Sequence, residues 1–229
     1  MWQDVRSELH PDGLEVVTVA LDVGGAQSAG PWIDMAKPEH PSLIDEAHLL
    51  DELLGIVNVP TGVWIDEQGM IVRPHEPAFP GKVGFADLEL PPNLPPRLAQ
   101  MLAEAAKMRI EPKRYLAAVR DWVANGTDSP FALDPDEVLE RSPARPPEAS
   151  EAAACFELGQ HLHRAGHSDD AVPWFRRAHA LQPANWTYKR QAWELVDPVT
   201  QGPSEQYEGD WLSDVRAIGA ENYYPPLNL

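Results

Sequence analysis

The segment at residues 55–74, GIVNVPTGVWIDEQGMIVRP, constrains the fold more than any other part of the chain. It contains two runs rich in β-branched residues, separated by Asp66-Glu67-Gln68-Gly69. Glycine supplies the positive φ that a tight hairpin turn needs. The segment therefore predicts two antiparallel strands. A nearly continuous apolar run at residues 14–22, LEVVTVALD, predicts a further strand buried on both faces of a sheet.

Helical patterns surround these strands. Apolar side chains at helical spacing predict a helix over residues 2–9, which Pro11-Asp12-Gly13 ends. Residues 23–30 are interpreted as a loop, and a short helix over 31–37 begins at a proline. Strands that alternate with helices in this way indicate an α/β fold.

The next predicted helix, over residues 46–54, lies between Asp45 as its cap and Gly55 as its end. Its leucines are expected to form a buried stripe facing the sheet, and its polar residues to form the cap and the solvated face. The predicted stripe comprises Leu49, Leu50, Leu53 and Leu54, and the predicted polar face comprises Asp45, Glu46, His48, Asp51 and Glu52.

Prolines separate the predicted helices in residues 75–147. Residues 75–96 are rich in Pro and Gly and are expected to lack regular structure. Helices are predicted over 97–109 and 113–124. Five prolines mark residues 127–147 as a linker that contains one short helix at about 136–141.

The order of these elements, and above all the segment around Val59, Pro60 and Thr61, resembles the thioredoxin-like superfamily in its ResA/TlpA-like branch. The resemblance implies a thioredoxin-like domain over residues 1–126. It also implies that Pro60 is a cis proline beside the redox site, and that Val59, Pro60 and Thr61 face a disulfide or protein substrate. The activity it implies is thiol- or selenol-dependent disulfide or peroxide chemistry, and we expect neither a cofactor nor a metal.

The chain differs from this family in the segment that supplies the reactive thiol. Family members have a strand followed by a helix with a CxxC-type motif at its N-terminus, where the helix dipole lowers the thiol pKa. Some actinobacterial members instead have WAxxUGxxxSxxP, in which U is selenocysteine encoded by an in-frame stop codon. This chain begins inside that helix, and its single cysteine, Cys155, excludes an internal CxxC pair.

Three explanations compete for this departure: a natural redox-inactive scaffold, a domain completed by another chain, or a reading frame that starts too late. We favour the third. In the family, the missing strand lies between the strands that correspond to residues 14–22 and 62–66. We therefore expect a gap between these strands, and exposed strand edges through which two copies of the chain could pair.

Residues 148–200 resemble a tetratricopeptide-like region. Residues 152–185 fit one repeat of about 34 residues, which folds as two antiparallel helices. Small residues are expected where the helices touch, larger ones between them, and a proline at the end. The small residues are Gly159 and Ala171, and the larger ones are Leu158, Leu162 and Phe175. Ala178 also matches the second helix, and Pro183 is the proline at the end.

A single repeat cannot bury its apolar face, so we expect further helices to cap it. These are predicted over residues 186–196 and, within a C-terminal region 201–229, over 211–218, with the tail at 221–226 lying back on the body. The repeat could hold a partner peptide or protein, or it could only stabilise the first domain. The sequence leaves both readings open.

Composition indicates which classes of partner and which compartment to expect. A formal net charge of −18, from 18 Lys+Arg against 36 Asp+Glu, would repel nucleic acid and anionic membranes, so neither is an expected partner. The start MWQDVRSELH carries no signal-peptide pattern, and we expect a cytoplasmic protein. The spacing of His161, His163 and His167 argues against a metal site, and Cys155 is expected to be a small buried apolar residue.

Two functional hypotheses follow. The first is a thioredoxin-like oxidoreductase or peroxidase-type protein whose CxxC or UGxxxS segment is absent from this chain, which is then inactive by itself. The alternative is a redox-inactive scaffold in which the two regions hold a protein partner.

Overall fold

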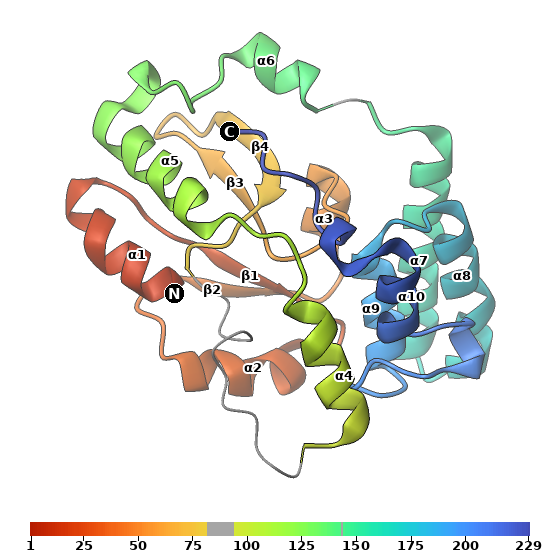
Figure 1. Ribbon diagram of the computed structural model, residues 1–229. Helices are drawn as coiled ribbons and strands as arrows, with labels where there is room; N and C mark the ends of the chain where they lie inside the picture. The colour runs from red at the N-terminus through yellow and green to blue at the C-terminus, as the bar shows by residue number, and fades with distance from the viewer. Residues whose placement is uncertain (82–93, 143) are drawn as a thin grey trace.

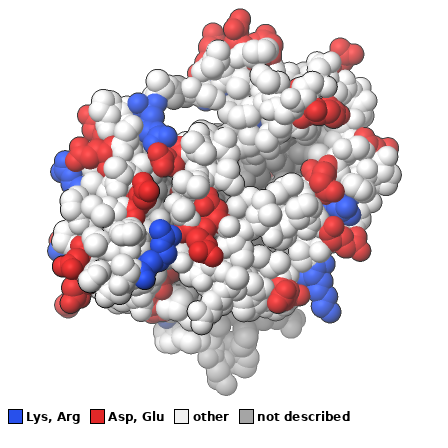
Figure 2. Space-filling model, turned by 180° about the vertical axis from the view of Figure 1, so that it is seen from behind, with Lys and Arg blue, Asp and Glu red and all other residues white. Residues whose placement is uncertain are grey.

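The computed structural model describes residues 1–81, 94–142 and 144–229 (Figure 1). The fold is mixed α/β: two small sheets lie among helices, and a helical region packs beside them (Figure 1). Most of the predicted proline-rich excursion, residues 82–93, lies outside the described residues. On the face shown in Figure 2, acidic side chains predominate over basic ones, in keeping with the net charge of −18.

The first sheet consists of β1 (Thr18–Leu21) and β2 (Ser42–Asp45), which pair in parallel with Val19 opposite Leu43. β1 covers only the second half of the strand predicted over residues 14–22. β2 was not predicted, because its SLID sequence was interpreted as the approach to a helix. A parallel pair needs a crossover connection, which α2 (Gly25–Ala36) supplies.

The bounds predicted for this crossover helix are wrong. α2 begins at Gly25 rather than at residue 31, so Pro31 lies inside the helix. The carboxylate of Asp22 explains the early start. It accepts hydrogen bonds from the Gly24 N–H (2.8 Å) and the Ser28 hydroxyl (2.6 Å), and thereby anchors the first turn.

The predicted hairpin is confirmed. β3 (Thr61–Ile65) and β4 (Ile71–Pro77) pair antiparallel, and Gly69 has a φ of 80° in the turn. The Asp66 carboxylate accepts hydrogen bonds from the N–H groups of Gln68 and Met70, which closes the turn. β4 continues to Pro77, so the first residues of the predicted irregular segment at 75–96 belong to a strand.

The two sheets are separate. Among the described residues no backbone hydrogen bond joins β1 to β3, as the predicted gap between these strands requires. No residue of β1 or β2 is fully buried, although parallel strands are usually covered on both faces. The four strands of the described residues therefore form two separate two-stranded sheets.

Two of the predicted helices form a core against the hairpin. α1 (Trp2–Leu9) and α5 (Pro112–Asn125) pack on β3 and β4, where the indole of Trp64 stacks on Trp122 with ring centroids 5.0 Å apart. The Trp64 Nε1–H donates to the Tyr115 hydroxyl (3.0 Å). Gly62 leaves room for that hydroxyl, since a Cβ at this position would lie 2.6 Å from it.

The orientation predicted for the helix after β2 is wrong. α3 (Leu49–Leu54) begins three residues later than expected, and Leu49 and Leu53 of the predicted buried stripe are 54% and 72% exposed. His48 and Asp51, placed on the solvated face, are instead buried, at 3% and 2%. The predicted capping residue, Asp45, ends β2, and its carboxylate accepts from the Leu50 N–H (2.8 Å).

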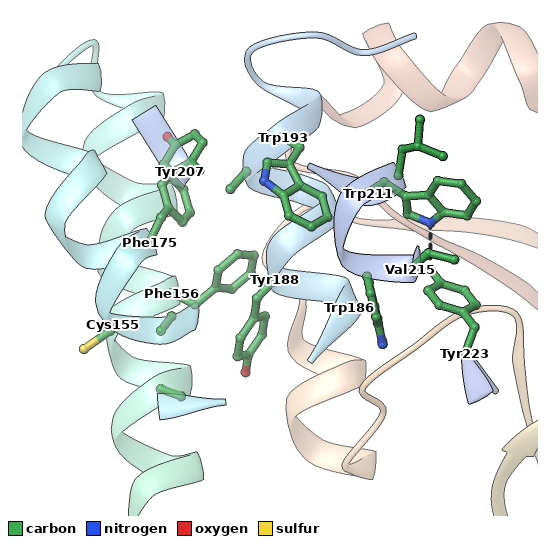
Figure 3. Close-up of a cluster of buried hydrophobic side chains, with 14 of the residues drawn as sticks. Cys155, Phe156, Phe175, Trp186, Tyr188, Trp193, Tyr207, Trp211, Val215 and Tyr223 are labelled. Carbon is green, nitrogen blue, oxygen red and sulfur yellow. Dashed lines mark hydrogen bonds between the residues drawn. The ribbon is translucent and has the colours of Figure 1, made fainter. Parts of the chain in front are cut away.

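The helical region follows the predicted pattern. α7 (Pro147–Arg164) and α8 (Ser168–Leu181) form a hairpin in which Gly159 contacts the Phe175 ring; a Cβ on Gly159 would lie 3.0 Å from that ring. α9 (Trp186–Glu194) packs on this hairpin, α10 (Trp211–Ile218) packs on α9, and an aromatic cluster fills the space between the helices (Figure 3). The helices that connect the two regions are α4 (Pro96–Ala105) and α6 (Pro135–Glu140).

Phe175 is the side chain on which this hairpin most depends. It is fully buried and meets the rings of Phe156 and Tyr207 edge-on, with centroids 5.5 and 5.9 Å away. We expect Phe175→Ala to lower the free energy of unfolding by ~3–5 kcal/mol in urea denaturation, because it leaves a cavity. Its exposed neighbour Trp174 is the matched control, and Trp174→Ala should cost less than about 1 kcal/mol. Equal losses would contradict this packing.

Candidate functional site

Of the predicted substrate-facing residues, Val59 and Pro60 lie in the loop between α3 and β3, and Thr61 is the first residue of β3. The Val59–Pro60 peptide bond is cis, as the resemblance implied. Pro60 is exposed, whereas Val59 and Thr61 are half-buried. The Thr61 hydroxyl donates to the Asn58 carbonyl (2.6 Å), which holds the loop in a tight turn.

The backbone groups of Val59 already have partners. Its N–H donates to the Asn58 side-chain oxygen (2.9 Å), and its carbonyl accepts from the Tyr224 hydroxyl (3.0 Å). The Asn58 side-chain amide in turn donates to the Tyr223 carbonyl (3.0 Å). The C-terminal tail therefore lies on this loop, and an extended substrate could reach the Val59 carbonyl only after the tail had moved.

A buried hydrogen-bonded cluster lies behind the loop, and the sequence analysis missed it. His48 contacts the Asp51 carboxylate through Nδ1 (3.1 Å) and the Gln191 side-chain oxygen through Nε2 (3.1 Å). The Val23 N–H donates to the same Gln191 oxygen (3.0 Å). Residues before α2, at the start of α3 and within α9 are joined in this way.

The geometry of this cluster indicates a structural role. The His48 ring packs edge-on against Phe156 of α7, with centroids 5.1 Å apart, and both of its nitrogens face groups of the protein itself. Its partner Gln191 lies 143 residues further along the chain. Local periodicity contains no signal for such a contact, which is why it could not be predicted.

Cys155 lies on α7 and is buried, as the sequence predicted. Burial raises the pKa of its thiol, and the nearby carboxylate of Glu151 raises it further. A thiol in this state is a poor nucleophile, since the thiolate is the reactive form. The state of Cys155 therefore does not favour a catalytic role for its thiol.

The described residues contain no cluster of three or more His, Cys, Asp or Glu side chains that could hold a metal ion. Likewise, none of the helices in the described part of the chain combines the length and the apolar character needed to cross a membrane.

Comparison with known proteins adds no identification, because no protein family, curated protein or solved structure matches the chain.

The buried cluster predicts a stability effect of its own. Gln191→Ala removes the side-chain oxygen that accepts from the Val23 N–H and contacts His48 Nε2, leaving the buried Val23 N–H without a partner. We expect it to lower the free energy of unfolding by ~1–3 kcal/mol. Gln27 is exposed on α2, and Gln27→Ala is the matched control, with an expected effect below about 0.5 kcal/mol. Denaturant titration of both variants tests this, and similar values would rule out a buried cluster.

His179 on α8 predicts a pH effect. Burial lowers its pKa from 6.5 to about 4, and its ring contacts the Tyr188 carbonyl (3.3 Å). Between these two pKa values the unfolded chain binds a proton that the folded chain does not, so stability falls as pH falls from about 6.5 towards 4. We expect His179→Gln to reduce the loss between pH 7 and 5 by ~1–2 kcal/mol in thermal or urea unfolding. An unchanged pH profile in the variant would contradict the burial of a neutral ring.

Proposed function

We propose that this chain is the substrate-facing part of a thioredoxin-like oxidoreductase that acts on disulfides or peroxides. The thiol or selenol that performs the chemistry is not among the residues of this chain. The observation that supports the proposal is the divided sheet, with the loop of Val59 and Pro60 directly before β3.

The proposal places one further strand between β1 and β3. β1 is paired with β2 on one side only, and β3 with β4 on one side only, among the described residues. A strand inserted between β1 and β3 would give a five-stranded sheet and would provide partners for the N–H and C=O groups on both inner edges. In thioredoxin-like proteins, the strand at this position leads into the helix that carries the nucleophile beside the cis proline.

The residues of this chain have a limited part in that chemistry. The cis-proline loop would orient an extended substrate through the backbone of Val59, once the Tyr224 hydroxyl has left its carbonyl. The nucleophile comes from outside the chain, because Cys155 is buried and has a raised pKa. The divided sheet also supports pairing of two copies through the same strand edges.

A redox-inactive scaffold is the second candidate, and a different observation favours it. Both the N–H and the C=O of Val59 are satisfied within the chain, so the loop is closed to substrate as it stands. The α7–α8 hairpin is also tied to the α/β region, because the His48 ring packs against Phe156 of α7. In this reading, the helical hairpin holds a peptide or protein partner and the α/β region only supports it.

One experiment distinguishes the two candidates. The DNA preceding the Met1 codon is read in frame, and the protein is expressed with that segment added. We expect a Cys or UGA codon about one helical turn upstream, preceded by codons for an apolar strand. The extended protein should then reduce a small disulfide or a peroxide with dithiothreitol as the reductant, whereas the chain of 229 residues should not.

The matched control is Cys155→Ser, which should leave the activity of the extended protein unchanged. An upstream region without a nucleophile codon, or a folded extended protein without activity, would reject the oxidoreductase and leave the scaffold.

A further inference from the structure

The last seven residues of the chain, 223–229, are held in the manner of a bound peptide. They form no helix or strand, and side chains from distant elements bind their backbone carbonyls. Arg114 of α5 donates to the carbonyls of Leu227 (3.2 Å) and Leu229 (2.6 Å). Arg73 of β4 and Arg141 after α6 both donate to the carbonyl of Asn228, at 3.0 and 2.7 Å.

Two adjacent tyrosines anchor the other end of this tail. Tyr223 is buried edge-on against Trp186, with ring centroids 4.6 Å apart, and its hydroxyl accepts a hydrogen bond from the Trp211 indole (3.2 Å; Figure 3). Tyr224 meets the Phe79 ring edge-on at 4.9 Å and donates to the Val59 carbonyl. Burial raises the pKa of the Tyr224 phenol, which keeps it protonated as a donor.

The surface beneath the tail is held in place by contacts of its own. We call this the tail-binding surface; it comprises Asn58, Val59, Arg73, Phe79, Arg114 and Arg141. Arg73 is almost fully buried, and it also donates to the Glu76 carboxylate and to the Phe131 carbonyl (2.8 Å). Arg114 also donates to Glu111 (3.1 Å). Arg73 therefore stays oriented when the tail leaves.

Such a combination is typical of the recognition of extended peptides. Main-chain hydrogen bonds give affinity for any sequence, and a few buried aromatic side chains give specificity. Pro225 and Pro226 lie exposed between the two sets of contacts, and proline keeps the segment extended without needing a partner for an N–H group.

We propose that the tail-binding surface is a peptide-binding site for extended segments with two adjacent tyrosines followed by prolines. The chain's own tail fills the site in the folded protein, and a partner segment of the same chemistry takes its place when the tail is displaced. The proposal does not depend on redox activity, because every contact that supports it is made by residues of this chain.

The tail has a strong advantage over a separate peptide. A tethered segment acts at an effective concentration in the millimolar range, so a free peptide competes poorly while the tail is intact. The contacts of the chain's own tail must therefore be weakened before binding of a separate peptide can be measured.

The test uses the full chain with Tyr223→Ala and Tyr224→Ala, together with a labelled synthetic peptide of residues 221–229. Fluorescence anisotropy measures binding, and circular dichroism checks that helix content is retained. We expect the variant to bind the peptide at least tenfold more tightly than the unmodified chain does. A control peptide with both tyrosines replaced by alanine should bind at least tenfold more weakly than the labelled peptide. Adding Arg114→Ala to the variant should also weaken binding by about tenfold.

A folded variant that does not bind the peptide would overturn the proposal. Equal binding to the variant and the unmodified chain would also overturn it, because the peptide would then occupy another surface. If the double variant loses helix content, Tyr224→Phe replaces it, since this change removes only the hydroxyl that bonds Val59. That variant should bind the peptide about fivefold more tightly than the unmodified chain. No difference between them would reject the site.

Discussion

The contact between His48 and Gln191 determines how the two regions of the molecule fit together. It places α9 against the start of α3, and the Val57 carbonyl then accepts from the first N–H groups of α9, at Trp186 and Thr187. Val57 lies directly before the loop of Asn58, Val59 and Pro60, so the loop's position is fixed by the helical region as well as by the sheet. The same arrangement brings Trp186 beneath Tyr223 and holds the tail over Val59.

The divided sheet is the second constraint. β1 and β2 have no fully buried residue, whereas the hairpin β3–β4 packs on Trp122, Tyr115 and α1 and has a core of its own. The stable part of the first region is thus the hairpin with its two helices. The parallel pair is held mainly through α2 and through the Val23 N–H bond to Gln191, which belongs to the other region.

Sequence reasoning succeeded where structure is decided locally. The hairpin turn depends on Asp66 and Gly69, and the α7–α8 pair depends on small and large residues in helical register, so both could be predicted. Sequence reasoning failed where the local structure depends on a residue far away in the sequence. The orientation of α3 depends on Gln191, and the closure of the Val59 loop depends on Tyr224, 165 residues away. The early start of α2 depends on a carboxylate in the preceding loop that propensity alone does not reveal.

The way in which the tail is held also bears on how its sequence can evolve. Arg73, Arg114 and Arg141 bind main-chain oxygens, which every residue type supplies, so substitution of the exposed Asn228 leaves these bonds in place. Leu227 and Leu229 also pack their side chains against the hairpin core, so they are expected to remain apolar. The distance between the tyrosines and these main-chain oxygens is fixed by the number of residues between them. The length of the tail is therefore more constrained than the residue at position 228, because a single insertion or deletion after Tyr224 would shift every later main-chain oxygen away from its arginine.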